Sequence, residues 1–381
     1  MPTTGLINRR LQYAERPDSY SKRPAMQNAW KPRALRNGIA AMLLFSVFAL
    51  LPRDATGQLQ PNDRTITKVG TTAAQFLKIG VGARAISLGG TFVAQANDLS
   101  AVYWNPGGLA NLQGSTAQLA RTDYLADISY NFAGFGTNLG SAGTIAVSLI
   151  YLDSGSMVVR TEEAPEGTGE EFDVRNLALQ VSYAKALTDK FSIGTTIKYI
   201  QESIWHSSAS AMAIDIGLLF TTPYENLRLG ANMANFGPKM RIGGRDILFS
   251  EDPNPTQEGN VEIVNAQYLT DGHPLPLIFR IGLAWDAVRL PDHTVVLMTD
   301  AAHPNDNSEY VNVGLEYSFR NLLALRSGMR NMFETDGEQG LTFGAGLNFR
   351  LDRSLRISFD YAYADFGRLE ETHWLTLDLT F

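Results

Sequence analysis

The chain lacks cysteine altogether, which excludes a disulfide framework in its 381 residues. It also lacks a basic excess, since 32 lysines and arginines face 39 aspartates and glutamates for a net charge of −7. No basic stripe stands out that would neutralise phosphates, so we expect no nucleic-acid partner. What remains is a glycine-rich chain, 44% hydrophobic, whose composition fits one large β domain.

Long hydrophobic runs are also missing, with one exception at residues 38–51. Basic residues precede this run and small residues follow it, as in a secretory signal, and we place cleavage after Gly57. Residues 1–57 are thus predicted to be a signal peptide with an N-terminal extension, with Met26 as an alternative start. A signal anchor is the other interpretation, although the run is short for a spanning helix. No later run could cross a bilayer as a helix, so a membrane-embedded mature chain must be a closed barrel.

From residue 115 onward, segments of about ten residues alternate polar and apolar side chains between turn-forming residues. The chain stops on such a segment, with Leu375, Leu377, Leu379 and Phe381 on the apolar face and Thr376, Asp378 and Thr380 on the other. We expect the apolar face to contact lipid, and Leu377, Leu379 and Phe381 to form the outer-membrane assembly signal. Fourteen strands are predicted, at 115–122, 128–137, 142–153, 172–185, 191–204, 209–221, 226–235, 276–287, 293–302, 309–319, 322–330, 340–350, 354–364 and 372–381.

A soluble sandwich shows the same alternation, but connection lengths favour a barrel. Long connections at 154–171, 236–275 and 331–339 are all odd-numbered, and the even-numbered connections are short. Short periplasmic turns alternating with longer external loops are typical of transmembrane barrels. Aromatic residues near many strand ends, Trp374 among them, are expected at headgroup depth, although strands are enriched in aromatics in any case. The predicted fold class is therefore all-β, a 14-stranded antiparallel transmembrane β-barrel over residues 115–381.

Residues 58–114 do not alternate and are predicted to form a hatch segment with one short helix. Asn97 or Asp98 is expected to cap that helix, and Pro106 with two glycines to end it. A dinucleotide-binding loop at Gly80 and Gly82 is rejected, because the third glycine is missing and no βα unit precedes it.

Residues 76–109 resemble the N-terminal signature of the PorV/PorQ family, which is related to FadL-type outer-membrane transporters. The resemblance implies an outer-membrane location in bacteria and a hatch packed inside a fourteen-stranded barrel, with Gly107 replacing the usual alanine. The residues that carry it are Gly80, Gly82, Arg84, Gly89, Gly90, Asn97, Asp98, Trp104, Asn105 and Pro106.

Catalytic chemistry finds little support in the sequence. No two of the five histidines have metal-ligand spacing. His206 and His303 fall near the external rim with Asp306, but no motif fixes their geometry, and we expect ordinary loop residues. We predict no enzyme activity and no cofactor. Charges expected in the lumen are interpreted as pairing with one another and with the hatch, with a selective conduit as the alternative. They are Lys198, Asp215, Arg228, Arg280, Asp286, Asp300, Glu316, Arg326, Arg356 and Asp360.

Two functions compete. The resemblance implies a type IX secretion component that binds cargo proteins by their C-terminal signal domains and shuttles them to the surface attachment machinery. External loops would be the working surface, and candidate partner-binding residues are Glu162, Glu163, Glu170, Glu171, Phe249, Glu251 and Asp252. The acidic loop has a simpler interpretation as a solvated loop. The alternative function is a FadL-like transporter of hydrophobic solutes, for which apolar residues of the loop 236–275 would form a groove; we expect them instead to pack that loop onto the rim. Outer-membrane lipid is a partner in both cases.

Overall fold

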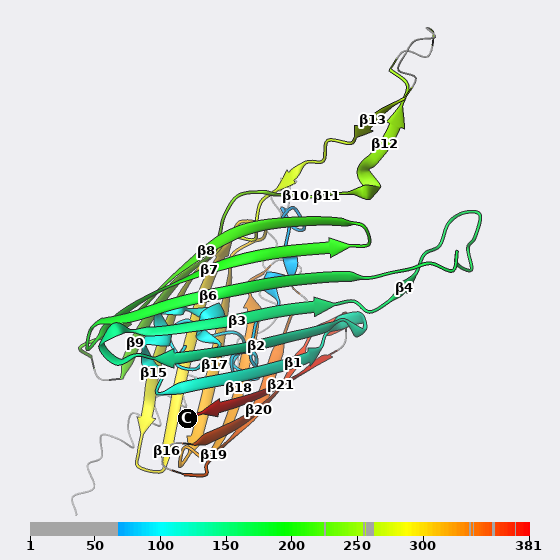
Figure 1. Cartoon of the computed structure of the whole chain (residues 1–381). Coiled ribbons are helices and arrows are strands. Elements are labelled where there is room, and N and C mark those ends of the chain that lie inside the picture. The colour runs from blue at the N-terminus through cyan, green and yellow to red at the C-terminus, as the bar shows by residue number, and fades with distance from the viewer. Residues whose placement is uncertain are drawn as a thin grey trace, which may run out of the picture.

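The computed structural model describes residues 68–381 except 225, 254–255, 257–262, 335–336, 338, 353–354 and 370. The predicted signal and extension lie outside the described residues. The chain forms a closed antiparallel barrel (Figure 1), in which each strand pairs with its sequence neighbours and β1 pairs with β21. Its fourteen strands are β1 (Ser115–Asp123), β2 (Ser129–Asn138), β3 (Thr144–Asp153), β6 (Val174–Thr188), β7 (Phe191–Ile204), β8 (Ser207–Thr221), β9 (Leu227–Phe236), β15 (Ile278–Arg289), β16 (His293–Pro304), β17 (Tyr310–Phe319), β18 (Leu323–Met332), β19 (Leu341–Arg350), β20 (Arg356–Asp365) and β21 (Glu371–Thr380).

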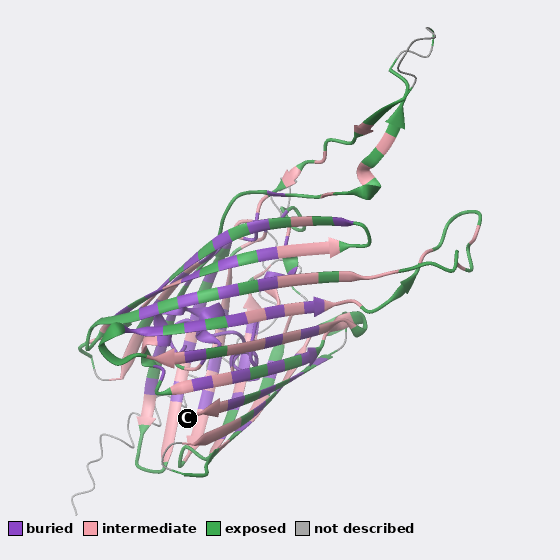
Figure 2. Cartoon of the chain, in the orientation of Figure 1, coloured by how far each residue is buried: buried purple, intermediate pink, exposed green. Residues whose placement is uncertain are grey.

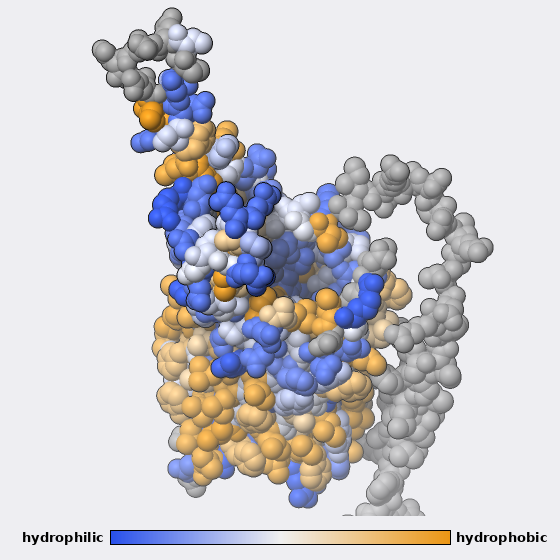
Figure 3. Space-filling view, turned by 90° about the vertical axis from the view of Figure 1, so that its right-hand side faces the viewer, coloured by the Kyte–Doolittle hydropathy of each residue, from blue (hydrophilic) through white to orange (hydrophobic). Residues whose placement is uncertain are grey.

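The predicted fold class is confirmed, and each predicted strand is found within a few residues of its expected place. Burial alternates along the strands (Figure 2), because successive side chains point to opposite faces of the sheet. In β21, Leu375 and Leu377 are exposed on the outer face, whereas Thr376 and Asp378 are buried inside. The outer face forms an apolar belt between two polar rims (Figure 3).

One aromatic residue departs from the expectation of rings at headgroup depth. Trp374 points into the barrel, where it is almost completely buried and packs edge-on against Tyr130. Its indole nitrogen donates to the Thr372 hydroxyl over 3.0 Å. Trp374 has the opposite parity to Leu375, and strand parity therefore overrides the preference of a single ring for the interface.

The two ends of the barrel differ as the connection lengths predict. At one end β3 and β6 are joined through a small hairpin of β4 (Met157–Val158) and β5 (Glu171–Phe172). The connection from β9 to β15 leaves the same end and holds β10 (Met240–Arg241), β11 (Gly243–Gly244), η5 (Arg245–Ile247), β12 (Leu248–Glu251), β13 (Val264–Gln267) and β14 (Gly272–His273). Transmembrane barrels place longer loops outside the cell, so we call this end external and the other periplasmic.

The segment 68–114 lies inside the barrel as a hatch of short helices. It begins beside external residues and ends at the periplasmic rim, where Asn138 donates its backbone N–H to Gly114. Among the described residues no helix is long and apolar enough to span a bilayer. The hatch helices are η1 (Gln75–Lys78), α2 (Ala83–Ser87), α3 (Ala101–Trp104) and η2 (Pro106–Asn111), and short helices elsewhere are η3 (Leu125–Asp127), η4 (Gly140–Ala142) and η6 (Gly367–Leu369).

The predicted hatch helix is shorter than expected, and its capping differs. Ser100 rather than Asn97 precedes α3, and Asp98 acts one turn earlier by accepting the backbone N–H of Ser100 over 3.0 Å. Pro106 does not simply end the helix: it begins the separate 3-10 helix η2. Proline suits the first position of a helix, because a backbone N–H at that position would have no acceptor within the helix.

Candidate functional site: the hatch and the external mouth

The hatch rests on the barrel wall through glycines on both sides of the contact. A Cβ atom on Gly230 of β9 would collide with the carbonyl of Val93, and one on Gly328 of β18 would collide with Leu88 and Gly89. From the hatch side, a Cβ on Gly89 would meet backbone atoms of Met329 at 2.9 Å. The wall glycines are therefore contact points for the hatch. They let two backbones touch, which is possible only where no side chain stands between them.

Asn105 and Pro106 join α3, η2 and the wall. The Asn105 amide donates to the carbonyls of Val93 (2.7 Å) and Leu218 (2.8 Å), and its oxygen accepts the N–H of Gly107 (3.0 Å). The side chain therefore satisfies backbone groups of the hatch and of β8 at the same time. Such buried groups are costly when left unpaired, so this asparagine holds the turn in place.

Arg84 joins the hatch to the wall through several charged and polar contacts. Its guanidinium donates two hydrogen bonds to Glu316 of β17, at 3.0 and 3.1 Å, and contacts Asn97 at 2.6 Å and Asp98 at 3.3 Å. The negative charges of Glu316 and Asp98 stabilise the charged guanidinium inside the barrel. Two other residues of the predicted motif, Asn97 and Asp98, thus contact this cation.

The ion pairs continue around the wall. Glu316 also accepts from Arg326 at 2.7 Å, and Arg326 binds Asp360 at 2.6 Å. On the other side of the barrel Lys198 pairs with Asp215 at 2.6 Å, and Arg228 with Asp286 at 2.6 Å. Buried charges need such partners because water is excluded. The structure thus agrees with the interpretation that lumen charges pair with one another and with the hatch.

Two further wall charges bind the hatch without an ion pair to it. Asp300 accepts the backbone N–H groups of Phe92 (2.9 Å) and Val93 (3.0 Å). Arg280 lies over the ring of Trp104, with 5.5 Å from its guanidinium carbon to the ring centroid. The Trp104 indole nitrogen in turn donates to the carbonyl of Val81 over 2.8 Å. The cation–π contact and the amide contacts hold the centre of the hatch against β15 and β16.

The external end of the hatch is held by Asp306, in the loop between β16 and β17. This carboxylate accepts from the Thr72 hydroxyl at 2.8 Å, the Lys78 ammonium at 3.0 Å and the Gln75 amide at 3.1 Å. Burial raises the pKa of Asp306, but these hydrogen bonds and the charge of Lys78 outweigh burial and hold it below the ordinary value. The partners lie more than 225 residues apart in sequence, so no local pattern could reveal the cluster.

The external loops carry the predicted partner-binding residues. Glu162, Glu163, Glu170 and Glu171 are exposed in and beside the hairpin β4–β5. Phe249 lies in a second hairpin, β12–β13, which extends away from the barrel mouth (Figure 1), and it packs against Tyr268 at 4.7 Å between ring centroids. Glu251 ends β12, and Asp252 follows it. The partner-binding role of all these residues stays a prediction.

The expectation that this loop packs on the rim is wrong for the hairpin. Tyr268 and Leu269 are 64% and 83% exposed, and Leu248, Ile263 and Val264 are exposed as well. The sequence showed these apolar side chains, but only the fold reveals that no wall is within their reach.

His206 and His303 make separate contacts at the external rim. His206 contacts Asp246 and Arg245, whereas His303 contacts Glu309 at 2.9 Å. Asp306, which we expected near them, instead pairs with Lys78 of the hatch. Across the described residues no cluster of three histidine, cysteine or acidic side chains could hold a metal ion.

The C-terminal residues complete the barrel. Leu377 and Leu379 point outward, and Phe381 exchanges two backbone hydrogen bonds of 2.8 Å with Ser115. Its ring lies 6.4 Å from that of Phe135. The role of these residues as an assembly signal stays a prediction.

Comparison with solved structures supports the architecture. The CymD monoaromatic hydrocarbon channel superposes with a TM-score of 0.50, at 12% identity over 80% of this chain and 98% of that one. The Pseudomonas putida toluene transporter TodX (TM-score 0.49, 13% identity, 79% and 97% coverage) and a Pseudomonas aeruginosa FadL homologue (0.47, 11%, 79% and 98%) are also similar. At 12% identity the likeness to CymD shows the fold alone. No curated protein matches the sequence.

A family model, described as type IX secretion system protein PorV, matches residues 60–256, a little over half of the chain. The match contains the whole hatch motif and the wall from β1 to β9. The closed barrel, its internal hatch and this match agree: the chain is a bacterial outer-membrane β-barrel that belongs to the PorV family of the type IX secretion system.

Proposed function

We propose that this chain binds exported cargo proteins by their C-terminal signal domains at its external mouth and delivers them to the surface attachment machinery. The observation that carries the proposal is the hairpin β12–β13, which holds exposed apolar side chains far from any wall. Exposed apolar clusters rimmed by polar groups mark protein-binding surfaces. The family supplies the secretion context.

The hairpin has the chemistry to bind a β-structured partner. Its sheet contains only two strands among the described residues, so the outer edges of β12 and β13 have no strand partner there. An extended cargo segment can add to such an edge through main-chain hydrogen bonds, while Leu248 and Tyr268 contribute apolar contact. Glu251 and the acidic residues of the loop 154–171 favour basic cargo residues and fast encounter.

The interior supports an interaction protein over a solute channel. Hatch residues such as Val81, Ile86 and Leu99 have no exposed surface, and the hatch touches the wall at backbone distance. A FadL-like transporter would need this packing to yield a path for a hydrophobic solute.

The test is capture of a cargo C-terminal signal domain by the full-length barrel in mild detergent. The triple variant Leu248→Ser, Tyr268→Ser, Leu269→Ser is expected to bind at least roughly tenfold more weakly, since the loss of one interface anchor of about 2 kcal/mol already exceeds the roughly 1.4 kcal/mol of a tenfold change. The matched control, Met157→Ser with Val158→Ser, removes exposed apolar residues from the other hairpin and is expected to bind normally.

Unchanged capture by the triple variant, with a normal barrel melting temperature, would contradict the proposal. Co-purification of a hydrocarbon from the lumen, together with altered uptake in hatch variants, would establish the transporter instead.

A further inference from the structure

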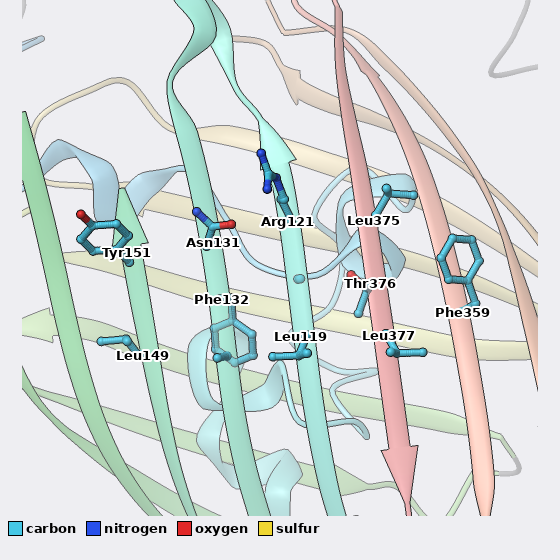
Figure 4. Close-up of a pocket in the computed structure, with 12 residues that line it drawn as sticks. Leu119, Arg121, Asn131, Phe132, Leu149, Tyr151, Phe359, Leu375, Thr376 and Leu377 are labelled. Atoms are coloured by element: carbon cyan, nitrogen blue, oxygen red, sulfur yellow. The ribbon is translucent and has the colours of Figure 1, made fainter. Parts of the chain in front are cut away.

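A groove opens on the outer wall of the barrel, on the face formed by β20, β21, β1, β2 and β3 (Figure 4). Its volume is about 360 Å³, and its lining is predominantly apolar. That volume is at the lower end of ligand sites in proteins. The groove lies within the lipid-facing belt.

The strand register explains the groove. Along one row of outward side chains, Phe359, Leu377, Leu119, Ala133 and Leu149 are direct cross-strand neighbours. Ala133 is the small member between Leu119 and Leu149, and its short side chain leaves the floor of a slot between two leucines. A slot of this kind, with a predominantly apolar lining, fits a segment of an acyl chain.

The next outward row toward the external end is polar on β1, β2 and β3, and Leu375 of β21 continues it beside Arg121. Arg121, Asn131 and Tyr151 are cross-strand neighbours on β1, β2 and β3, and Figure 4 shows them together above Leu119 and Leu149. Each stands two residues from the external end of its strand, or about 7 Å along it. That depth is where headgroups replace acyl chains, and a lipid-facing arginine is tolerated there.

The charges around this row leave Arg121 open to an anion. Arg121 is highly exposed and contacts Asp123 at 3.3 Å, an exposed pair of the kind that contributes little. The Tyr151 hydroxyl donates to Asp153 over 3.1 Å, above the row. A phosphate placed below these carboxylates would meet the guanidinium of Arg121 and the amide of Asn131, which both donate hydrogen bonds.

We propose that this groove binds one phosphate-bearing lipid of the outer leaflet, with an acyl chain in the slot over Ala133 and the phosphate on Arg121 and Asn131. The site does not depend on the proposed cargo function. It predicts a bound lipid that stays with the barrel when bulk lipid is replaced by detergent.

The experiment is native mass spectrometry of the full-length barrel, exchanged into mild detergent with either phosphatidylglycerol or phosphatidylcholine. We expect one retained phosphatidylglycerol and weaker retention of the zwitterionic lipid. Arg121→Gln should reduce phosphatidylglycerol retention roughly fivefold, the effect of one basic residue near a membrane surface. Ala133→Leu should fill the slot and reduce retention of both lipids.

Two control variants are matched to these changes. Arg320→Gln removes an arginine of similar exposure, 62% against 68%, from an exposed pair at the periplasmic rim. Ala345→Leu enlarges an outward alanine of β19 outside the groove. Both are expected to retain lipid as the wild type does. Equal retention of the two lipids, or the same loss in target and control variants, would overturn the proposal and leave only unspecific annular lipid.

Discussion

At the scale of single residues, the hatch fits closely against the wall because the residues at the contact points are glycines, which have no side chain. Gly194, Gly217, Gly314 and Gly344 repeat the arrangement at Gly230, since a Cβ on each would collide with a hatch atom. Polar side chains such as Asn105 and Asp300 fill the remaining positions with hydrogen bonds to hatch backbone. The hatch is thus packed directly against the wall.

A methyl group at Gly230 tests this contact. Gly230→Ala forces the Cβ into the Val93 carbonyl, and we expect a loss of about 1–3 kcal/mol in the free energy of unfolding, the usual cost of overpacking. Thermal unfolding in detergent measures it. Gly243→Ala, where the added Cβ meets open space, should change stability by no more than about 0.5 kcal/mol. Equal melting temperatures for Gly230→Ala and Gly243→Ala would show that the hatch can move away from the wall at little cost.

At the scale of elements, η1 is held by two carboxylates, Asp306 and Glu202. Asp306 binds three side chains of the segment 72–78, and Glu202 of β7 accepts the N–H of Ala74 over 3.0 Å. η1 is a single turn, too short to be stable alone, so its order comes from these contacts.

The pH dependence of this anchor follows from the lowered pKa of Asp306. A carboxyl whose pKa is lower in the folded state stabilises that state above its ordinary pKa, 3.8, and loses the contribution as pH falls through the folded value. Hydrogen exchange of the Leu77 and Ile79 amides, corrected for intrinsic rates, should therefore stay slow at neutral pH. It should accelerate only as the pH falls below the ordinary carboxyl pKa of 3.8.

Asp306→Asn should accelerate this exchange about tenfold or more at neutral pH, because hydrogen bonds to a charged group contribute about 1.5–3 kcal/mol. Glu309→Gln alters an exposed carboxylate in the same loop and should leave the segment protected. If both variants exchange like the wild type, Asp306 does not anchor the hatch.

At the scale of the whole molecule, depth in the bilayer decides what an outward position tolerates. Val181 and Leu187 of β6 are 55% and 56% exposed, but one is at mid-strand and the other near the periplasmic end. Val181→Arg should cost about 2–4 kcal/mol in lipid vesicles and Leu187→Arg about 0–1 kcal/mol. Urea unfolding followed by tryptophan fluorescence measures the difference. Equal costs would mean that the outer face is not in contact with acyl chains.

The sequence by itself determined the barrel, its strand count and its parity of loops. These follow from side-chain alternation and turn spacing, which are local properties of the chain. The hatch motif does not alternate, and it was identified through its resemblance to a family. Even the face of each strand was readable, as Asp215 inside and Met212 outside illustrate. Trp374 is the exception, because the parity of its strand, and not the chemistry of its ring, decides that it lies inside the barrel.

Tertiary structure alone decided which distant residues meet. Asp306 and Lys78, Arg84 and Glu316, and Gly230 and Val93 are brought together by closure of the barrel around the hatch, and no spacing in the chain encodes those distances. The exposed hairpin β12–β13 and the groove over Ala133 were likewise decided only by the tertiary structure. Whether an apolar side chain is buried depends on what the fold places beside it, and local sequence carries no record of that neighbour.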